Sequence, residues 1–198
     1  MQTSKTASIT PTGSYKRKTQ KHKDRYDAPT SVNNKFGFKD FTLSDSQKKC
    51  LTVIENNIIT FVQGRAGTGK TMIALHYAVQ QYLKEYSQRI IVIRTPVEAN
   101  STDKIGYLPS ELKDKIEPHF VSAKTILEDL LNKDKVDADL NGPYKRIQFL
   151  IPNFALGVTW DNATIIIDES QMMQPLIMKL LLERIGVNSK VIVLGDPS

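Results

Sequence analysis

The 198-residue sequence predicts an α/β protein in which helices cover both faces of a mostly parallel β-sheet. Short apolar runs alternate with longer stretches that have apolar residues at helical spacing, and such alternation requires crossover connections between parallel strands. The five predicted strands are residues 58–63, 89–94, 147–151, 164–167 and 191–194. Ligands of such sheets bind at the carboxyl ends of the strands. Three segments with the residue types of a binding site follow predicted strands here: residues 64–71, 168–171 and 195–196.

The helices are predicted from capping residues and from apolar periodicity. Ser44 and Gln47 form an S-x-x-Q capping box that opens a first helix. The other predicted helices are residues 72–86, 110–116, 119–131 and a last helix from Pro175 to Gly186. The second and third of these are expected to be separate helices because Pro118 lies between them. The charged residues 132–142 are predicted to form a loop.

The net charge of +6 is concentrated in the first 35 residues, which hold eight basic and two acidic residues. This segment is rich in Thr, Ser and Gln and poor in large apolar residues. Residues 1–35 are therefore predicted to be a disordered basic arm that precedes a single domain of residues 36–198. Two interpretations of the arm are equally open: contact with the phosphate backbone of a nucleic acid such as RNA, or a solvated tail.

Composition and cysteine use indicate a cytoplasmic protein. The sequence has no apolar run of about 18 residues, which a membrane-spanning helix would need. The N-terminus has no apolar segment of the kind found in secretory signals. Cys50 is the single cysteine, so an intrachain disulfide is excluded and a reducing compartment is favoured.

Residues 64–71 match the phosphate-binding pattern G-x-x-x-x-G-K-[ST] in full. This phosphate loop consists of Gly64, Arg65, Ala66, Gly67, Thr68, Gly69, Lys70 and Thr71. Glycines let the backbone N–H groups point at the phosphates, and the following helix adds its positive N-terminus. Lys70 would reach the β- and γ-phosphates, and the Thr71 hydroxyl would ligate Mg²⁺. A chance glycine-rich turn is disfavoured because the motif follows an apolar strand and opens a helix, so nucleoside triphosphate binding is predicted.

Two adjacent carboxylates, Asp168 and Glu169, directly follow the apolar run of residues 164–167. On a strand beside the phosphate loop, Asp168 would lie near the metal and Glu169 would orient or deprotonate the attacking water. The alternative is an ordinary strand end with solvated acids, which the phosphate loop makes less favoured. GTP is disfavoured as the substrate because the guanine-recognition pattern N-K-x-D begins at Asn132 but has Lys135 in the aspartate position.

Together, these segments resemble the PhoH-like family of phosphate-starvation-inducible ATPases, whose core is similar to superfamily 1 helicases. The resemblance covers the chain from about Leu43 to its last residue. The segments that carry it are residues 64–71, R-T-P-V-E-A at 94–99, I-G-Y-L-P at 105–109, D-E-S-Q at 168–171, R-I-G at 184–186 and G-D at 195–196. It implies a three-layer P-loop NTPase fold of the RecA-like type. It also implies ATP binding, Mg²⁺-dependent hydrolysis and work linked to RNA or to unwinding.

The resemblance also suggests roles for residues outside the phosphate loop. Gln47 is similar to a glutamine that reads adenine in related helicases, and this role and its capping role are equally open. Gln171 and Asp196 would couple the γ-phosphate to the conformational state. Arg94 and Arg184 are candidate charge stabilisers, either in their own site or as arginine fingers for a neighbouring subunit of a ring. For both arginines a surface or ion-pair role is modestly favoured.

Two departures from the family pattern affect the expected activity. Residues 156–159 read L-G-V-T where the family often has R-G-R-T, so both arginines are lacking. The sequence ends at Ser198, where relatives continue, which predicts a fragment or a shortened form with an unpaired sheet edge. The alternative function is therefore a nucleotide-binding protein that binds RNA without hydrolysing ATP. A third hypothesis is a subunit whose site is completed only in a homo-oligomeric ring.

Overall fold

The structure is a computed structural model that describes residues 42–84, 89–96 and 109–197, with the backbone alone for residues 109–116. The chain divides into two units, residues 1–31 and 32–198, and every described residue belongs to the second unit. The predicted basic arm, residues 1–35, therefore lies outside the described residues.

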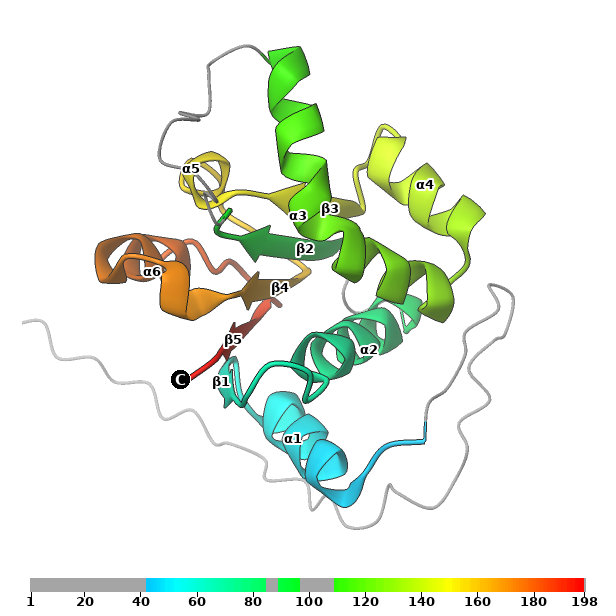
Figure 1. The fold of residues 1–198 in the computed structure, drawn as a ribbon, viewed down its shortest axis with the longest axis vertical. Helices are drawn as coiled ribbons and strands as arrows, with labels where there is room; N and C mark the ends of the chain where they lie inside the picture. The colour runs from blue at the N-terminus through cyan, green and yellow to red at the C-terminus, as the bar shows by residue number, and fades with distance from the viewer. Residues whose placement is uncertain (1–41, 85–88, 97–108, 198) are drawn as a thin grey trace, which may run out of the picture. The chain divides into compact units, whose positions relative to one another are not determined.

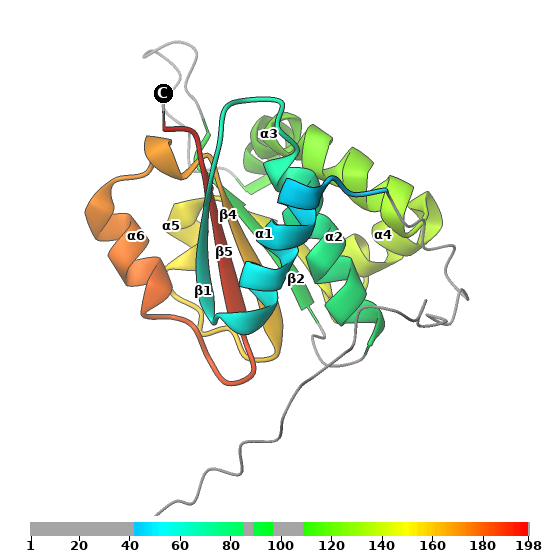
Figure 2. The same ribbon diagram turned by 90° about the horizontal axis from the view of Figure 1, so that it is seen from below.

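The described residues form one five-stranded sheet in the order β1-β5-β4-β2-β3, and all four strand pairs are parallel. The strands are β1 (Ile59–Gln63), β2 (Arg89–Arg94), β3 (Ile147–Leu150), β4 (Ala163–Asp168) and β5 (Lys190–Gly195). Helices lie on both sides of this sheet (Figures 1 and 2). The predicted three-layer α/β fold is confirmed, and each predicted strand is present within one residue at either end.

The two faces of the sheet carry different sets of helices. The helices are α1 (Asp45–Asn56), α2 (Lys70–Leu83), α3 (Pro109–Leu130), α4 (Lys133–Asn141), α5 (Pro152–Ala155), the short 3₁₀ helix η2 (Ser170–Met172) and α6 (Pro175–Leu182). Figure 2 shows α1 to α4 on one side of the sheet and α5 with α6 on the other. The capping box that begins α1 is present as predicted, with both of its hydrogen bonds.

The apolar core is divided by the sheet into two clusters. Ile166, Ile192 and Leu194 pack with α1 to α4, whereas Ile165 and Val193 pack with α5 and α6. Successive strand residues point to opposite faces, so a strand covered on both sides must be apolar throughout. This requirement explains why the central strands were recognisable in the sequence as uninterrupted apolar runs.

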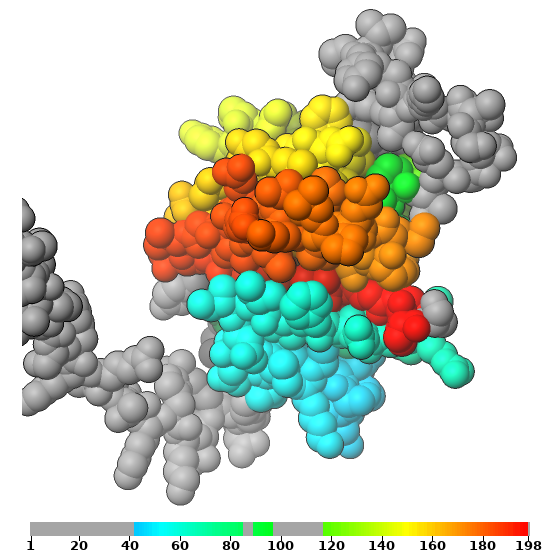
Figure 3. All heavy atoms as spheres, turned by 90° about the vertical axis from the view of Figure 1, so that its left-hand side faces the viewer, coloured from blue at the N-terminus to red at the C-terminus, as the bar shows by residue number. Residues whose placement is uncertain are grey.

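Strand β1 lies at one edge of the described sheet and is only partly covered. Among the described residues it pairs with β5 alone. The side chains of Ile59 and Phe61 are 39% and 61% exposed. Both residues are in register with β5 residues that pack against α6, so they lie on the α6 side of the sheet. Figure 3 shows this part of the chain at the surface, beside α6.

Helix α3 differs from the prediction of two helices separated near Pro118. The structure has one helix, with Pro118 inside it, and Figure 1 shows that this helix is bent. A proline in a helix removes one backbone hydrogen bond. Beyond Pro118, Phe120 and Leu127 are 2% and 0% exposed in the core, and this burial outweighs the lost bond.

The prediction of a loop at residues 132–142 is wrong, because most of this segment forms α4. Asn132 caps the helix by accepting a hydrogen bond of 2.8 Å from the backbone N–H of Lys135. Val136 is fully buried in the core, and Asp139 is 7% exposed. A helix with one inward-facing stripe can carry many charges on its other side, which is why composition alone suggested a loop.

Helix α6 begins with Pro175 at its first turn, as predicted, but it ends at Leu182 before reaching Gly186. Gly186 lies instead directly after the bridge between Trp160 and Ile185, where its N–H donates a hydrogen bond of 2.8 Å to the Trp160 carbonyl. A Cβ atom on Gly186 would lie 2.6 Å from that same carbonyl oxygen. The glycine is therefore needed for a close approach of two backbone segments, not for ending the helix.

Among the described residues, no helix combines the length and apolarity needed to cross a membrane.

Candidate functional site

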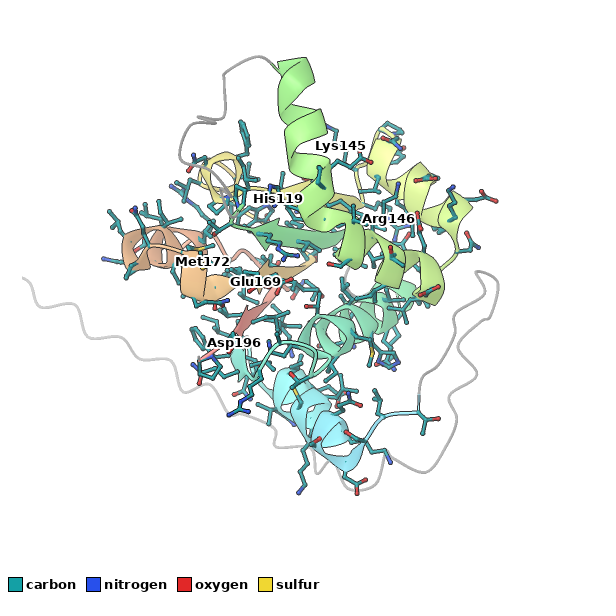
Figure 4. All side chains as sticks on the ribbon, viewed as in Figure 1. His119, Lys145, Arg146, Glu169, Met172 and Asp196 are labelled. Carbon is teal, nitrogen blue, oxygen red and sulfur yellow. The ribbon has the colours of Figure 1, made fainter. Side chains whose placement is uncertain are left out.

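The sheet brings the three predicted segments to one edge. Residues 64–69 follow β1, Asp168 ends β4, and Gly195 ends β5, which lies between these two strands. Gln63 is in register with Gly195, so β1 and β5 reach this edge together. Figure 4 shows Glu169 and Asp196 near one another at this edge, away from Lys145 and Arg146, which precede β3. The site is thus built at the carboxyl ends of the strands.

The phosphate loop has the backbone that an anion cradle requires. Gly67 and Gly69 have φ angles of 77° and 83°, in the left-handed region that glycine adopts without strain. Helix α2 begins at Lys70, so its first N–H groups and the positive end of its dipole face the loop. The backbone from Gly69 to Lys70 therefore joins a glycine turn to a helix N-terminus, which is the arrangement that binds phosphates.

The Lys70 side chain folds back over the loop. Its ammonium group donates hydrogen bonds to the carbonyl oxygen of Gly64 and, at 2.9 Å, to that of Arg65. The Thr68 hydroxyl also donates to the Arg65 carbonyl, at 2.8 Å. The positive charge is therefore held inside the loop, where an incoming phosphate would meet it.

Thr71 and Asp168 form a pair of oxygen ligands suited to Mg²⁺. The Thr71 hydroxyl donates to Asp168 Oδ2 at 3.4 Å, and Asp168 is 5% exposed. Burial raises the pKa of the Asp168 carboxyl above its usual value, while nearby Arg94 acts to lower that pKa. Mg²⁺ commonly takes one or two protein oxygens together with substrate phosphates and water, so a hydroxyl and a carboxylate fit a metal that is shared with a phosphate. Among the described residues, no group of three or more His, Cys, Asp or Glu side chains is arranged to hold a metal ion.

A chain of hydrogen bonds joins the predicted catalytic residues to the phosphate loop. Gln171 Nε2 donates to Glu169 Oε2 at 2.6 Å, and Gln171 Oε1 accepts from the Asp196 backbone N–H at 3.1 Å. Asp196 Oδ2 in turn accepts from the backbone N–H of Ala66 at 2.9 Å. Glu169 itself has φ of 51°, in the left-handed region. The structure therefore brings Glu169, Gln171 and Asp196 together beside the loop.

Arg94 is also part of this group of side chains. Its guanidinium lies 3.9 Å from Asp168 Oδ2 and 3.4 Å from Glu169 Oε1. This is the ion-pair role that the sequence modestly favoured. The register of β2 and β4 determines which acids Arg94 can pair with, because it places Arg94 directly beside Asp168.

Gln47 completes the capping box and lies beside the phosphate loop. Its Oε1 accepts a hydrogen bond of 3.0 Å from the Ser44 backbone N–H, which completes the capping box. Its Nε2 faces the phosphate loop, since a Cβ atom on Gly69 would lie 3.2 Å from it. The cap is confirmed, and adenine recognition by Gln47 stays a prediction.

The structure does not bring Arg184 into this site. The Arg184 carbonyl accepts a hydrogen bond of 3.0 Å from the N–H of Trp160, and Trp160 precedes β4. Arg184 is exposed at the amino ends of the strands, whereas the phosphate loop lies at the carboxyl ends. The structure therefore gives no support to a catalytic role for Arg184 within its own chain, and a role in a neighbouring subunit stays a prediction.

Two other predicted features lie apart from the site or outside the described residues. Asn132 and Lys133 begin α4, which contacts β3 at the opposite edge of the sheet from β1. The incomplete guanine pattern is therefore not beside the phosphate loop. Most of the family-like segments at residues 94–99 and 105–109 lies outside the described residues.

Comparison with known proteins identifies relatives for most of the described chain. A family model described as "PhoH-like protein" matches residues 42–198. The chain is 36% identical over 150 residues to a PhoH-like protein of Synechocystis sp. and 34% identical over 152 residues to one of Bacillus subtilis. It is 31% identical over 153 residues to Protein PhoH of Escherichia coli K12.

These matches cover 76–77% of this chain but only 43–46% of the relatives, so the chain spans less than half the length of the curated relatives it matches. Among solved structures, the large terminase from a thermophilic bacteriophage matches with a TM-score of 0.45 and 14% sequence identity. That match covers 78% of this chain and 39% of the terminase chain.

Proposed function

Since this chain belongs to the PhoH-like family and has the nucleotide-binding fold described above, we propose that it is an ATPase that uses Mg²⁺. The observation that carries the proposal is the contact between Thr71 and Asp168, 3.4 Å apart, beside the Lys70 ammonium in the phosphate loop. A hydroxyl, a buried carboxylate and an ammonium at a helix N-terminus are the groups needed to hold a triphosphate and its metal.

In this proposal each residue has one task. The loop N–H groups and Lys70 bind and neutralise the phosphates, and Thr71 with Asp168 would hold Mg²⁺, which would neutralise charge on the phosphate oxygens. Glu169 orients the attacking water and accepts its proton. Gln171 and Asp196 connect Glu169 to Ala66 of the loop, so they are placed to sense the γ-phosphate.

Adenine as the base bound, and RNA as a partner, rest on additional features. Gln47 presents its Nε2 to the loop while its Oε1 is used in the cap, which supports adenine recognition. The basic arm of residues 1–35 precedes the proposed ATPase domain of residues 36–198, and its positive charge supports a contact with RNA. We place the protein in the cytoplasm on the basis of its single cysteine.

The test is phosphate release from MgATP by the purified chain, with and without RNA, compared with Lys70→Ala. We expect the Lys70→Ala variant to lose at least about 100-fold in turnover, since it removes a charge that stabilises the transition state. Lys179→Ala is the matched control, because Lys179 is 73% exposed on α6 and pairs with the exposed Glu183 at 4.0 Å. Wild-type release no greater than that of Lys70→Ala would rule out the ATPase.

A second candidate is a protein that binds nucleotide and RNA without turnover. It is favoured by residues 156–159, where the family pattern has arginines and this chain has a 43% exposed Val158. ATP binding without phosphate release, together with salt-sensitive RNA binding that is lost on deletion of residues 1–35, would support it.

A ring in which a neighbour completes the site is a further proposal, and the exposed Arg184 supports it. Specific activity that rises with protein concentration, and falls in Arg184→Gln, is expected for a ring. Full activity of a monomer would exclude it.

A further inference from the structure

Arg94 connects three elements around the candidate site. It is the last residue of β2, and the parallel register places it directly beside Asp168 at the end of β4. Its Nη2 donates to Glu169 Oε1 at 3.4 Å, and its Nη1 lies 3.9 Å from Asp168 Oδ2. The same Nη1 donates to the backbone carbonyl of His119 in α3 at 3.1 Å. Figure 4 shows His119 and Glu169 on either side of the end of β2.

These contacts hold the guanidinium in one orientation. The Arg94 side chain is 24% exposed, and the planar fork of the guanidinium matches acceptors that lie in different directions. An arginine finger has to reach out of its own subunit, whereas these acceptors of Arg94 belong to its own chain. The geometry therefore opposes a role for Arg94 in a neighbouring site.

The effect of these contacts falls on Glu169. The backbone at Glu169 is in the left-handed region, with φ of 51° and ψ of 44°, which directs its side chain differently from a regular strand end. Its two carboxylate oxygens are then held from two sides, Oε1 by Arg94 and Oε2 by Gln171. Gln171 is anchored to Asp196 at the phosphate loop, and Arg94 is anchored to α3.

We propose that Arg94 is a positioning residue for the proposed hydrolysis, which orients the Glu169 carboxylate by tying it to the backbone of α3. Arg94 acts through Glu169 and not on the nucleotide. This inference rests on the proposed function. It assigns to α3, which is far from the phosphate loop in sequence, a direct connection to the residue that handles the attacking water.

The test compares Arg94→Gln and Arg94→Lys with Arg89→Gln. Arg89 is the matched control because it lies at the other end of β2, where it donates to the Asp161 carbonyl at 2.6 Å. We expect Arg94→Gln to lower kcat by about 10–100-fold, as is typical for residues that orient a functional group. Binding of a fluorescent ATP analogue should change by less than about 3-fold, because Arg94 is proposed to act through Glu169 and not on the nucleotide. Arg94→Lys should recover part of the loss, since a lysine keeps the charge but not the fork.

The double variant with Glu169→Gln tests whether Arg94 works through Glu169. We expect Arg94→Gln to have no further effect on kcat once Glu169 is replaced, because the group that it orients is gone. The inference is overturned if Arg94→Gln has the activity of Arg89→Gln. It is also overturned if Arg94→Gln weakens binding of the analogue by the same factor by which it lowers kcat. A third contrary result would be that Arg94→Gln and Glu169→Gln lower kcat by independent factors.

A readout that does not need turnover separates this inference from the proposed function. Urea unfolding of the wild type, Arg94→Gln, Glu169→Gln and the double variant gives the coupling between the two side chains. We expect the unfolding equilibrium constants to show a coupling of about 2–5-fold, the range for a partly exposed ion pair. If the wild type releases no phosphate, the ATPase fails while a measured coupling still supports the contact. Additive effects on unfolding would overturn the contact in either case.

Discussion

The left-handed backbone at Glu169 gives a prediction in which two variants of the same residue differ in a defined direction. Glu169→Ala and Glu169→Gly both remove the carboxylate and its contacts with Arg94 and Gln171. Only the glycine variant also removes the Cβ atom from a backbone with φ of 51°. We therefore expect Glu169→Gly to be more stable than Glu169→Ala.

The expected difference follows from two opposing effects. A residue with a Cβ atom is destabilised by about 1–2 kcal/mol in the left-handed region. Glycine loses more backbone entropy on folding, and that opposes its advantage by about 0.5–1 kcal/mol. The glycine variant should then be ahead by about 0.5–1 kcal/mol, or about 1–4 °C in Tm for a protein of this size.

Urea and thermal unfolding followed by tryptophan fluorescence will measure this difference, since Trp160 is the single tryptophan and is 1% exposed. The control is the same pair of substitutions at Lys179, which lies within α6. There glycine should be the less stable variant, by about 1 kcal/mol. A Glu169→Gly variant that is no more stable than Glu169→Ala would refute the left-handed assignment. Both Glu169 variants should lack ATPase activity.

Three further predictions concern the framework. Gly186→Ala should cost about 1–3 kcal/mol, because its Cβ would lie 2.6 Å from the Trp160 carbonyl oxygen, whereas Gly157→Ala, with no atom within 4 Å, should leave the urea midpoint unchanged. Asn132→Ala should lower stability by about 1 kcal/mol through loss of the α4 cap, and an unchanged midpoint would contradict the cap. Burial raises the pKa of Tyr77 from 10 to about 12, so its contribution to stability is present below pH 10 and is lost as the pH rises through 12. Between pH 10 and about 12, the free energy of unfolding should therefore fall less for Tyr77→Phe than for the wild type, as measured by urea unfolding at each pH.

The sheet and the phosphate loop were accessible from sequence because their signals are local. A strand buried on both faces must be apolar at every position, so residues 164–167 and 191–194 stood out from their surroundings. The loop is set by glycines with left-handed φ angles and by the lysine that opens α2, all within eight residues. Neither inference needs the order of the strands.

Helix α4 was missed because the interactions that hold it come from elsewhere in the chain. Its sequence is dominated by charged residues, and Val136 alone is fully buried among its apolar side chains. Asp139 is held by the Tyr82 hydroxyl of α2 and by Lys135, 2.8 Å away. A buried carboxylate needs such partners, and no pattern within residues 132–142 shows that a tyrosine of another helix supplies one.

The partners of Arg94 were inaccessible for a related reason. Strands β2 and β4 are separated in sequence by β3 and by helices α3 to α5, yet they are neighbours in the sheet. Their register alone sets Arg94 beside Asp168. A sequence that ends two strands with an arginine and an aspartate allows an ion pair, but the order of the strands decides whether one forms.

The strained backbone at Glu169 and the contacts around it belong to one arrangement. A left-handed non-glycine residue persists only where its surroundings fix it by several interactions. Here the side chain is held by Arg94, which is tied to α3, and by Gln171, which is tied to Asp196 and through it to Ala66 of the phosphate loop. Loss of the contact with Arg94 or with Gln171 would leave the backbone strain at Glu169 in place and remove part of the interaction energy that offsets it. Glu169, which is proposed to orient the attacking water, is therefore also the residue at the end of β4 through which the phosphate loop and α3 are connected by hydrogen bonds.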